Sequence, residues 1–224
     1  MRTNKLSQIR AKTKTTNAPQ ASEKNSNKKH GDELKLLQVA MDADLATLKN
    51  IPDLADKAKL KAEYIPKYWD FISHYFADKH HYANSILVQI MIWLFDISNM
   101  DKAVPLALAI IKQGVHTMPP QFGRNLETFV CDEIYDWSNA QLKQDKTASP
   151  YLDDLIDALT SEQWDVHVAV KSKIYAMQAK HKMRLGEYQN VLDLCDKAIE
   201  ANPEKHGVKK LRQDAEKKLK PETK

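Results

Sequence analysis

Two pairs of neighbouring acids are the side chains in this sequence whose type and spacing could hold a divalent metal ion. Asp132 and Glu133 form one pair, and Asp153 and Asp154 form the other. Carboxylates that share a Mg²⁺ ion can activate water for phosphodiester cleavage, so a metal-dependent endonuclease is one hypothesis. Each pair also has a structural explanation. The first fits the polar edge of an amphipathic helix, and the second fits the start of a helix, where the dipole favours negative charge.

No complete catalytic motif accompanies these acids. The closest approach to a nuclease PD…(D/E)xK pattern is Asp53 with Glu63 and Lys67, and its final spacing is wrong. His80 and His81 are adjacent, so on a helix their side chains point about 100° apart rather than toward one metal ion. A Gly-rich phosphate-binding loop is also missing. We therefore predict no catalytic residue, no metal site and no cofactor.

Basic residues at the two ends of the chain suit a different chemistry, the neutralisation of nucleic-acid phosphates. Residues 1–30 carry eight Lys or Arg and one Glu, giving +7, and residues 205–224 carry eight Lys or Arg and three acids, giving +5. The formal net charge of +4 leaves −8 for the residues between. A solubilising tail is the alternative reading of the first segment. The predicted DNA contacts are Arg2, Lys5, Arg10, Lys12, Lys14, Lys28 and Lys29.

The elements that carry these side chains are predicted to be α-helices throughout, because the chain has only five glycines and long runs of Ala, Leu, Lys, Glu and Asp. We predict a flexible basic arm over residues 1–31 and a helical core and oligomerisation domain over residues 32–145, whose first helix is capped by Asp32. A helical C-terminal region with a basic tail follows over residues 146–224. Its three long helices are predicted over residues 164–184, 187–201 and 204–219.

The stretch from Ser85 to Pro120 is predicted to be the centre of the core. Between Ile86 and Phe95 the only polar residue is Gln89, so this helix needs cover on every face. The run is far shorter than the ~18 residues that cross a bilayer, and no apolar signal segment follows the basic start of the chain. The two cysteines lie on apolar segments without metal-ligand spacing. We predict buried thiols in a reducing cytoplasm and no membrane contact.

The segment from Lys173 to Lys205 carries much of a tetratricopeptide repeat. Tyr175, Gly186, Tyr188, Ala198 and Pro203 occupy its characteristic positions, whereas Ala179 and Val191 depart from the pattern. An offset of 88 residues sets the turn after Asp96 on the same motif, so that Met100 aligns with Tyr188 and Ile110 with Ala198. Two degenerate helix-turn-helix repeats are therefore predicted within a helical bundle.

Three segments together resemble the GpM-type family of phage terminase small subunits, also labelled terminase, endonuclease subunit. They are KAEYIPKYWDFI, the run LVQIMIWLFDISNMDKAVPLALAIIKQGVHTMPPQFGRN, and the repeat-like tail with GVKKLRQDAEKKLKP. These segments cover roughly residues 57–135 and 165–221. The central run is the most specific of the three.

The resemblance implies a DNA-recognition subunit that binds the cohesive-end site of concatemeric viral DNA in the host bacterial cytoplasm. Its implied partners are double-stranded DNA, a large terminase subunit that supplies the ATPase and the nuclease, and further copies of itself, assembled as a ring. Two alternatives stay open: an endonuclease subunit that cuts the site itself, and a repeat-type protein scaffold unrelated to DNA.

Overall fold

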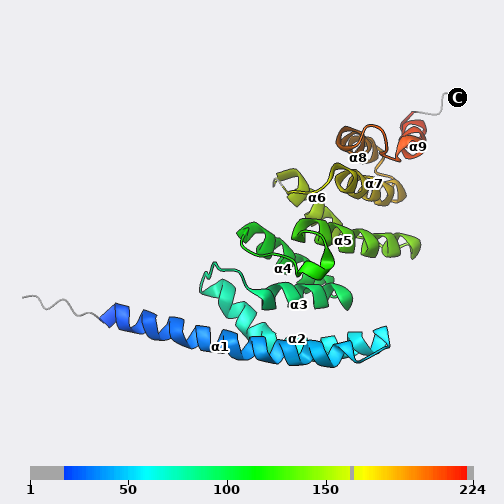
Figure 1. The fold of residues 1–224 in the computed structure, drawn as a ribbon. Coiled ribbons are helices and arrows are strands. Elements are labelled where there is room, and N and C mark those ends of the chain that lie inside the picture. The colour runs from blue at the N-terminus through cyan, green and yellow to red at the C-terminus, as the bar shows by residue number, and fades with distance from the viewer. Residues whose placement is uncertain (1–17, 162–163, 221–224) are drawn as a thin grey trace, which may run out of the picture. The chain divides into compact units, whose positions relative to one another are not determined.

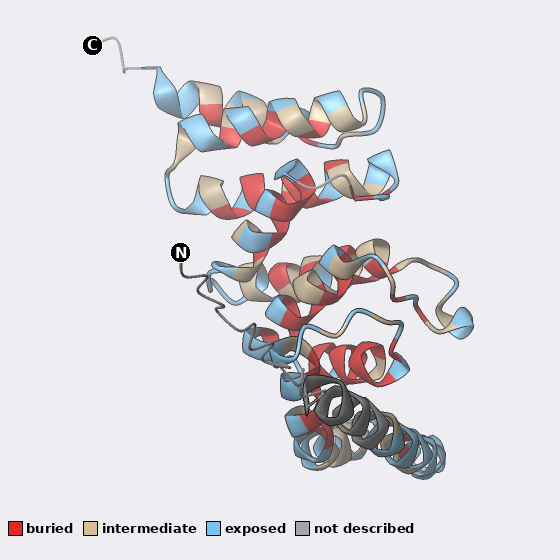
Figure 2. Cartoon of the chain, turned by 90° about the vertical axis from the view of Figure 1, so that its left-hand side faces the viewer, coloured by how far each residue is buried: buried red, intermediate tan, exposed pale blue. Residues whose placement is uncertain are grey.

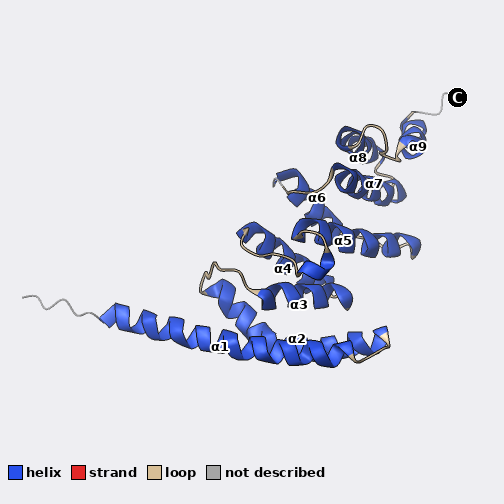
Figure 3. Ribbon diagram, viewed as in Figure 1, coloured by secondary structure: helices blue, strands red, loops and turns tan. Residues whose placement is uncertain are grey.

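The structure is a computed structural model that describes residues 18–161 and 164–220, with side chains described from residue 31 on. Over these residues the regular elements are nine α-helices and one 3-10 helix, without strands (Figure 3). The all-α prediction is therefore confirmed. The elements are α1 (Ala18–Lys49), α2 (Leu54–Ala77), α3 (Ser85–Asp96), α4 (Met100–Gln113), η1 (Pro120–Phe122), α5 (Leu126–Lys143), α6 (Tyr151–Ser161), α7 (Val168–Arg184), α8 (Tyr188–Ala201) and α9 (Lys209–Leu219).

The chain divides into two compact units, residues 1–46 and residues 47–224. The predicted arm boundary at residue 31 lies inside α1, and the predicted boundary at residue 145 lies in the turn between α5 and α6. The three-part division stays a prediction. None of the described helices is long and apolar enough to span a membrane.

Helix α1 begins at Ala18 rather than at Asp32, so the prediction that Asp32 caps the first helix is wrong. Residues 18–31 belong to this helix, and the assignment of residues 1–31 to a flexible arm stays a prediction. Proline is tolerated in a first turn, which accommodates Pro19. Extending an existing helix also costs far less than nucleating one, so the apolar stripe that starts at Leu34 supports a helix that extends toward the N-terminus. The start of the helix was predicted from its apolar stripe, whereas residues 18–31 can be helical through their intrinsic helix propensity alone.

Within the unit 47–224, successive helices pack on their neighbours along the chain from α2 to α9 (Figure 1). Helix α3 packs between α2 and α4. Nine of its twelve residues are buried, as its apolar sequence predicts. Figure 2 shows buried positions on the inner faces of these helices, and the largest fully buried side chains include Trp93, Tyr68, Tyr75 and Phe71. The ring of Tyr68 meets Trp93 edge-on, at 6.2 Å between ring centroids.

In the hairpins α3–α4 and α7–α8, the end of the first helix and both ends of the second helix correspond at an offset of 88 residues. Helix α3 ends at Asp96 and α7 at Arg184, and α4 and α8 then cover Met100–Gln113 and Tyr188–Ala201. The backbone hydrogen bonds of the two turns also correspond. The N–H of Asn99 donates to the carbonyl of Leu94 at 2.9 Å, and the N–H of Glu187 donates to that of Lys182 at 3.1 Å. The two segments are therefore equivalent helical hairpins, while their kinship with tetratricopeptide repeats stays a prediction.

Each of these turns contains one residue in the left-handed backbone region, where a side chain is strained. The residue is Ser98 (φ 56°) after α3 and Gly186 (φ 76°) after α7. The same conformation follows α2 at Lys79 (φ 55°) and α5 at Asp145 (φ 56°). Glycine fits this position without strain, so only the α7 turn has the residue that the sequence rule expects.

Candidate functional site

The residues predicted to contact DNA fall largely outside the described part of the chain. Arg2, Lys5, Arg10, Lys12 and Lys14 lie outside the described residues. Lys28 and Lys29 belong to the backbone of α1. The structure therefore does not test this site, and its seven residues stay a prediction.

The acids Asp132 and Glu133 lie on α5 and are held by one arginine from the loop before it. Arg124 donates from Nη1 to Asp132 at 2.5 Å and from Nη2 to Glu133 at 3.4 Å. The guanidinium also lies over the ring of Phe129, 4.9 Å from its centroid. Arg124 was not singled out from the sequence, because no local pattern indicates that its side chain contacts acids eight and nine residues later on α5.

Burial raises the pKa of Glu133, and Arg124 opposes that shift. Asp96, at the end of α3, is one of the carboxylates that raise the pKa further. Asp96 accepts a hydrogen bond from Nζ of Lys61 at 2.6 Å. Arg124 and Lys61 thus pair with the acids of this region in partly exposed ion pairs, which gives these side chains a structural role.

The second pair of acids, Asp153 and Asp154, lies at the start of α6. Asp153 accepts hydrogen bonds from the side chains of Ser149, at 2.5 Å, and Gln178. Burial and the neighbouring Asp153 and Asp157 raise the pKa of Asp154. The structure does not combine this pair with the α5 acids. In the described residues, no group of three or more His, Cys, Asp or Glu side chains is arranged to hold a metal ion.

A buried polar network joins the loop after α2 to the end of α4. Tyr75 donates from its hydroxyl to the carbonyl of Tyr82 at 2.7 Å, and Gln113 donates to the carbonyl of His80 at 3.0 Å. His116 accepts at Nδ1 from the backbone N–H of Asn84, at 3.2 Å. Burial lowers the pKa of His116, which keeps the ring neutral near pH 7. These groups anchor a loop, and His80 takes part through its backbone carbonyl.

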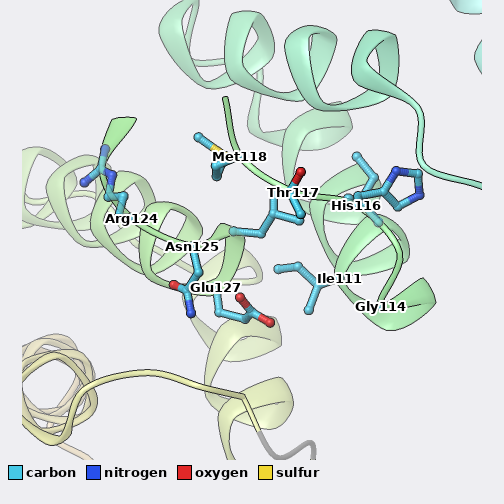
Figure 4. A pocket seen from close by; sticks show the side chains of 10 residues that line it. Ile111, Gly114, His116, Thr117, Met118, Arg124, Asn125 and Glu127 are labelled. Atoms are coloured by element: carbon cyan, nitrogen blue, oxygen red, sulfur yellow. The ribbon is translucent and has the colours of Figure 1, made fainter. Parts of the chain in front are cut away.

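A pocket of about 290 Å³ lies beside this network, between the end of α4 and the start of α5 (Figure 4). Its lining includes Ile111, His116, Met118 and Asn125. Asn125 caps α5 by accepting from the N–H of Thr128 at 2.9 Å. His116 and Asn125, two of the polar residues at the pocket wall, thus have structural roles in the loop and in the cap of α5.

Both cysteines are buried, as predicted. Burial raises the pKa of Cys131 to about 12 and that of Cys195 to about 11. Neither is a thiolate near neutral pH, so neither is suited to nucleophilic chemistry or to binding a metal ion as it stands.

Comparisons with known proteins place this architecture in context. A family model described as phage small terminase subunit matches residues 38–168, which include all of α2 to α6. A curated protein of Haemophilus phage HP1 (strain HP1c1), named probable terminase, endonuclease subunit, is 28% identical over 196 residues. The aligned region covers 81% of this chain and 69% of that relative. No solved structure matches the chain.

Proposed function

Because this chain belongs to the phage small terminase subunit family, we propose that it is the DNA-recognition subunit of a phage or prophage terminase. The family match over residues 38–168 is the observation that carries this proposal, and it places the chain in phage DNA packaging. The proposed ligand is the cohesive-end site of concatemeric double-stranded DNA, bound in the host cytoplasm. The proposed partner is a large terminase subunit that supplies the ATPase and the nuclease.

The basic N-terminal segment, residues 1–30, is the proposed principal DNA contact. Its charge of +7 over residues 1–30, against −8 for residues 31–204, supports binding to phosphates. Its proposed contacts are the seven residues predicted from the sequence: Arg2, Lys5, Arg10, Lys12, Lys14, Lys28 and Lys29.

A charge-removal variant tests the segment without shortening α1. In it, Arg2, Lys5, Arg10, Lys12 and Lys14 are all replaced by Gln, and binding to a cohesive-end duplex is measured over a range of salt concentrations. Each lost phosphate contact lowers the log–log salt slope by about 0.9, so the slope falls by up to about 4.5. Unchanged affinity and slope would remove the DNA role of this segment.

Self-association into a ring around or beside DNA is also proposed. The ring architecture implied by the family resemblance supports this assembly. Light scattering of the full chain should give one oligomer of defined mass, and the same mass for the five-residue Gln variant. A monomer at the concentrations where DNA binding occurs would contradict the ring.

A metal-dependent endonuclease is the second candidate, because the HP1 relative is named an endonuclease subunit. The four candidate acids argue for a structural role, since three of them accept hydrogen bonds from Arg124, Ser149 or Gln178. The purified chain with Mg²⁺ or Mn²⁺ and cohesive-end DNA, without the large subunit, tests this function. Cleavage that disappears when all four acids become their amides would establish it. The acids are Asp132, Glu133, Asp153 and Asp154.

A further inference from the structure

The exposed face of α9 carries a row of lysines that the proposed DNA-recognition role has not used. Lys209, Lys210 and Lys217 lie on α9, and Lys220 is its C-cap residue, with an extended backbone. At 100° per residue, the three helical lysines fall within a sector of about 100°, and Gln213 is the other α9 residue in it. All four lysines are exposed. These four residues are called the lysine face. Among the described residues, Lys217 is the member of the lysine face that forms an ion pair, with Asp214 at 3.8 Å.

The opposite side of α9 fixes this helix to the rest of its unit. Ala215 and Val208 are buried, with 0% and 1% of their surface exposed. Arg212 bonds to Asp196 on α8 and donates from Nε to Glu216 at 3.1 Å. Arg212 thus pairs with Asp196 and Glu216, while Asp214 pairs with Lys217 of the lysine face.

Two of these lysines stand where a positive charge costs stability. Lys209 and Lys210 are the first residues of α9, whose first turn contains no acid and whose N-cap residue, Val208, makes no side-chain cap. The helix dipole favours negative charge at this end and disfavours lysine. Lysines at a helix start that stabilise nothing else in the fold are typical of a surface used for binding.

We propose that the lysine face of α9 binds the phosphate backbone of double-stranded DNA as a second contact site; this inference rests on the proposed DNA-recognition role. Lys209 and Lys217 lie eight residues apart, which is about 12 Å along the helix. A duplex presents one phosphate charge about every 1.7 Å of its axis, so several phosphates lie within reach of the lysine face. Flexible lysine point charges suit sequence-independent contacts to phosphates rather than the reading of bases.

The test compares two variants of the full chain with equal loss of charge. The face variant is K209Q/K210Q/K217Q/K220Q, and the control variant, K59Q/K112Q/K143Q/K146Q, removes four exposed lysines from α2, α4, α5 and the turn after α5. We expect the face variant to bind both cohesive-end and unrelated duplexes more weakly, with a salt slope lower by about 2 to 4. The control should differ from the wild type by about 1 or less in the same slope.

A second variant separates binding from folding. Because acids suit the start of a helix, K209E/K210E should raise the melting temperature of the protein by about 1 to 4 °C while weakening DNA binding more than the face variant does per residue changed. A face variant that matches the control in affinity and slope would overturn the inference. So would normal DNA binding combined with lost binding to polyglutamate, which would assign the lysine face to an acidic protein segment. A wild-type chain that binds no DNA would instead refute the proposed function itself.

Discussion

The paired turns at Ser98 and Gly186 allow a direct test of the equivalence of the two hairpins. Both residues have positive φ, 56° and 76°, in turns with corresponding hydrogen bonds. A non-glycine residue costs about 1–2 kcal/mol in this conformation. Glycine returns about 0.5–1 kcal/mol of that through its greater freedom in the unfolded chain. The substitution Ser98→Gly should therefore stabilise the fold by about 0.5–1 kcal/mol, and Gly186→Ser should destabilise it by a similar amount.

Urea unfolding followed by helical circular dichroism measures both changes. With a denaturant slope of about 2 kcal/mol/M, the midpoints should move by about 0.25–0.5 M in opposite directions. The double variant S98G/G186S should return to within about 0.5 kcal/mol of the wild type, because the substitutions lie in separate hairpins. A destabilised or unchanged S98G protein would refute the left-handed geometry assigned to Ser98, and with it the equivalence of the two turns.

Three further outcomes follow from the polar and buried groups. Arg124→Met should destabilise the fold by about 1 kcal/mol at neutral pH, because Asp132 and Glu133 lose their shared cation. Burial raises the pKa of Glu133, so the loss measured by urea unfolding should shrink on acidification as Glu133 protonates. Cys131 and Cys195 should resist a thiol reagent at pH 8 in the native protein and react fully in denaturant, and rapid native labelling would contradict their burial. Burial lowers the pKa of His181 below its ordinary value, so its share of stability is full above about pH 6.5 and is lost as pH falls through its folded pKa. The acid-side slope of stability against pH should be shallower in His181→Gln, and an identical slope would count against a buried neutral ring.

The helices of the core could be predicted from local patterns because each pattern has a local physical cause. The apolar run from Ile86 to Phe95 requires burial, and the structure buries it. The correspondence of the two hairpins at an offset of 88 residues could be predicted from their small and apolar positions. Ala103 and Val191 occupy equivalent positions, and both are fully buried in their hairpins.

The rest could not be predicted because it depends on long-range contacts or on rules with exceptions. Arg124 and Gln113 acquire their roles from partners on other segments, as when Gln113 reaches the carbonyl of His80, 33 residues away. Lys79, Ser98 and Asp145 adopt a conformation for which the sequence rule expects glycine or asparagine, so their left-handed backbone was not predicted. The start of α1 was placed too late because weak helix propensity was read as disorder.

The central claim is that this chain is a DNA-recognition subunit, and the salt dependence of its binding to a cohesive-end duplex tests that claim most directly. If the seven predicted residues of the N-terminal segment and the lysine face of α9 neutralise phosphates, the log–log slope for the full chain should be about −10. The cohesive-end duplex should also be preferred over an unrelated duplex at equal salt. Absent binding, or binding that does not weaken with salt, would contradict the account.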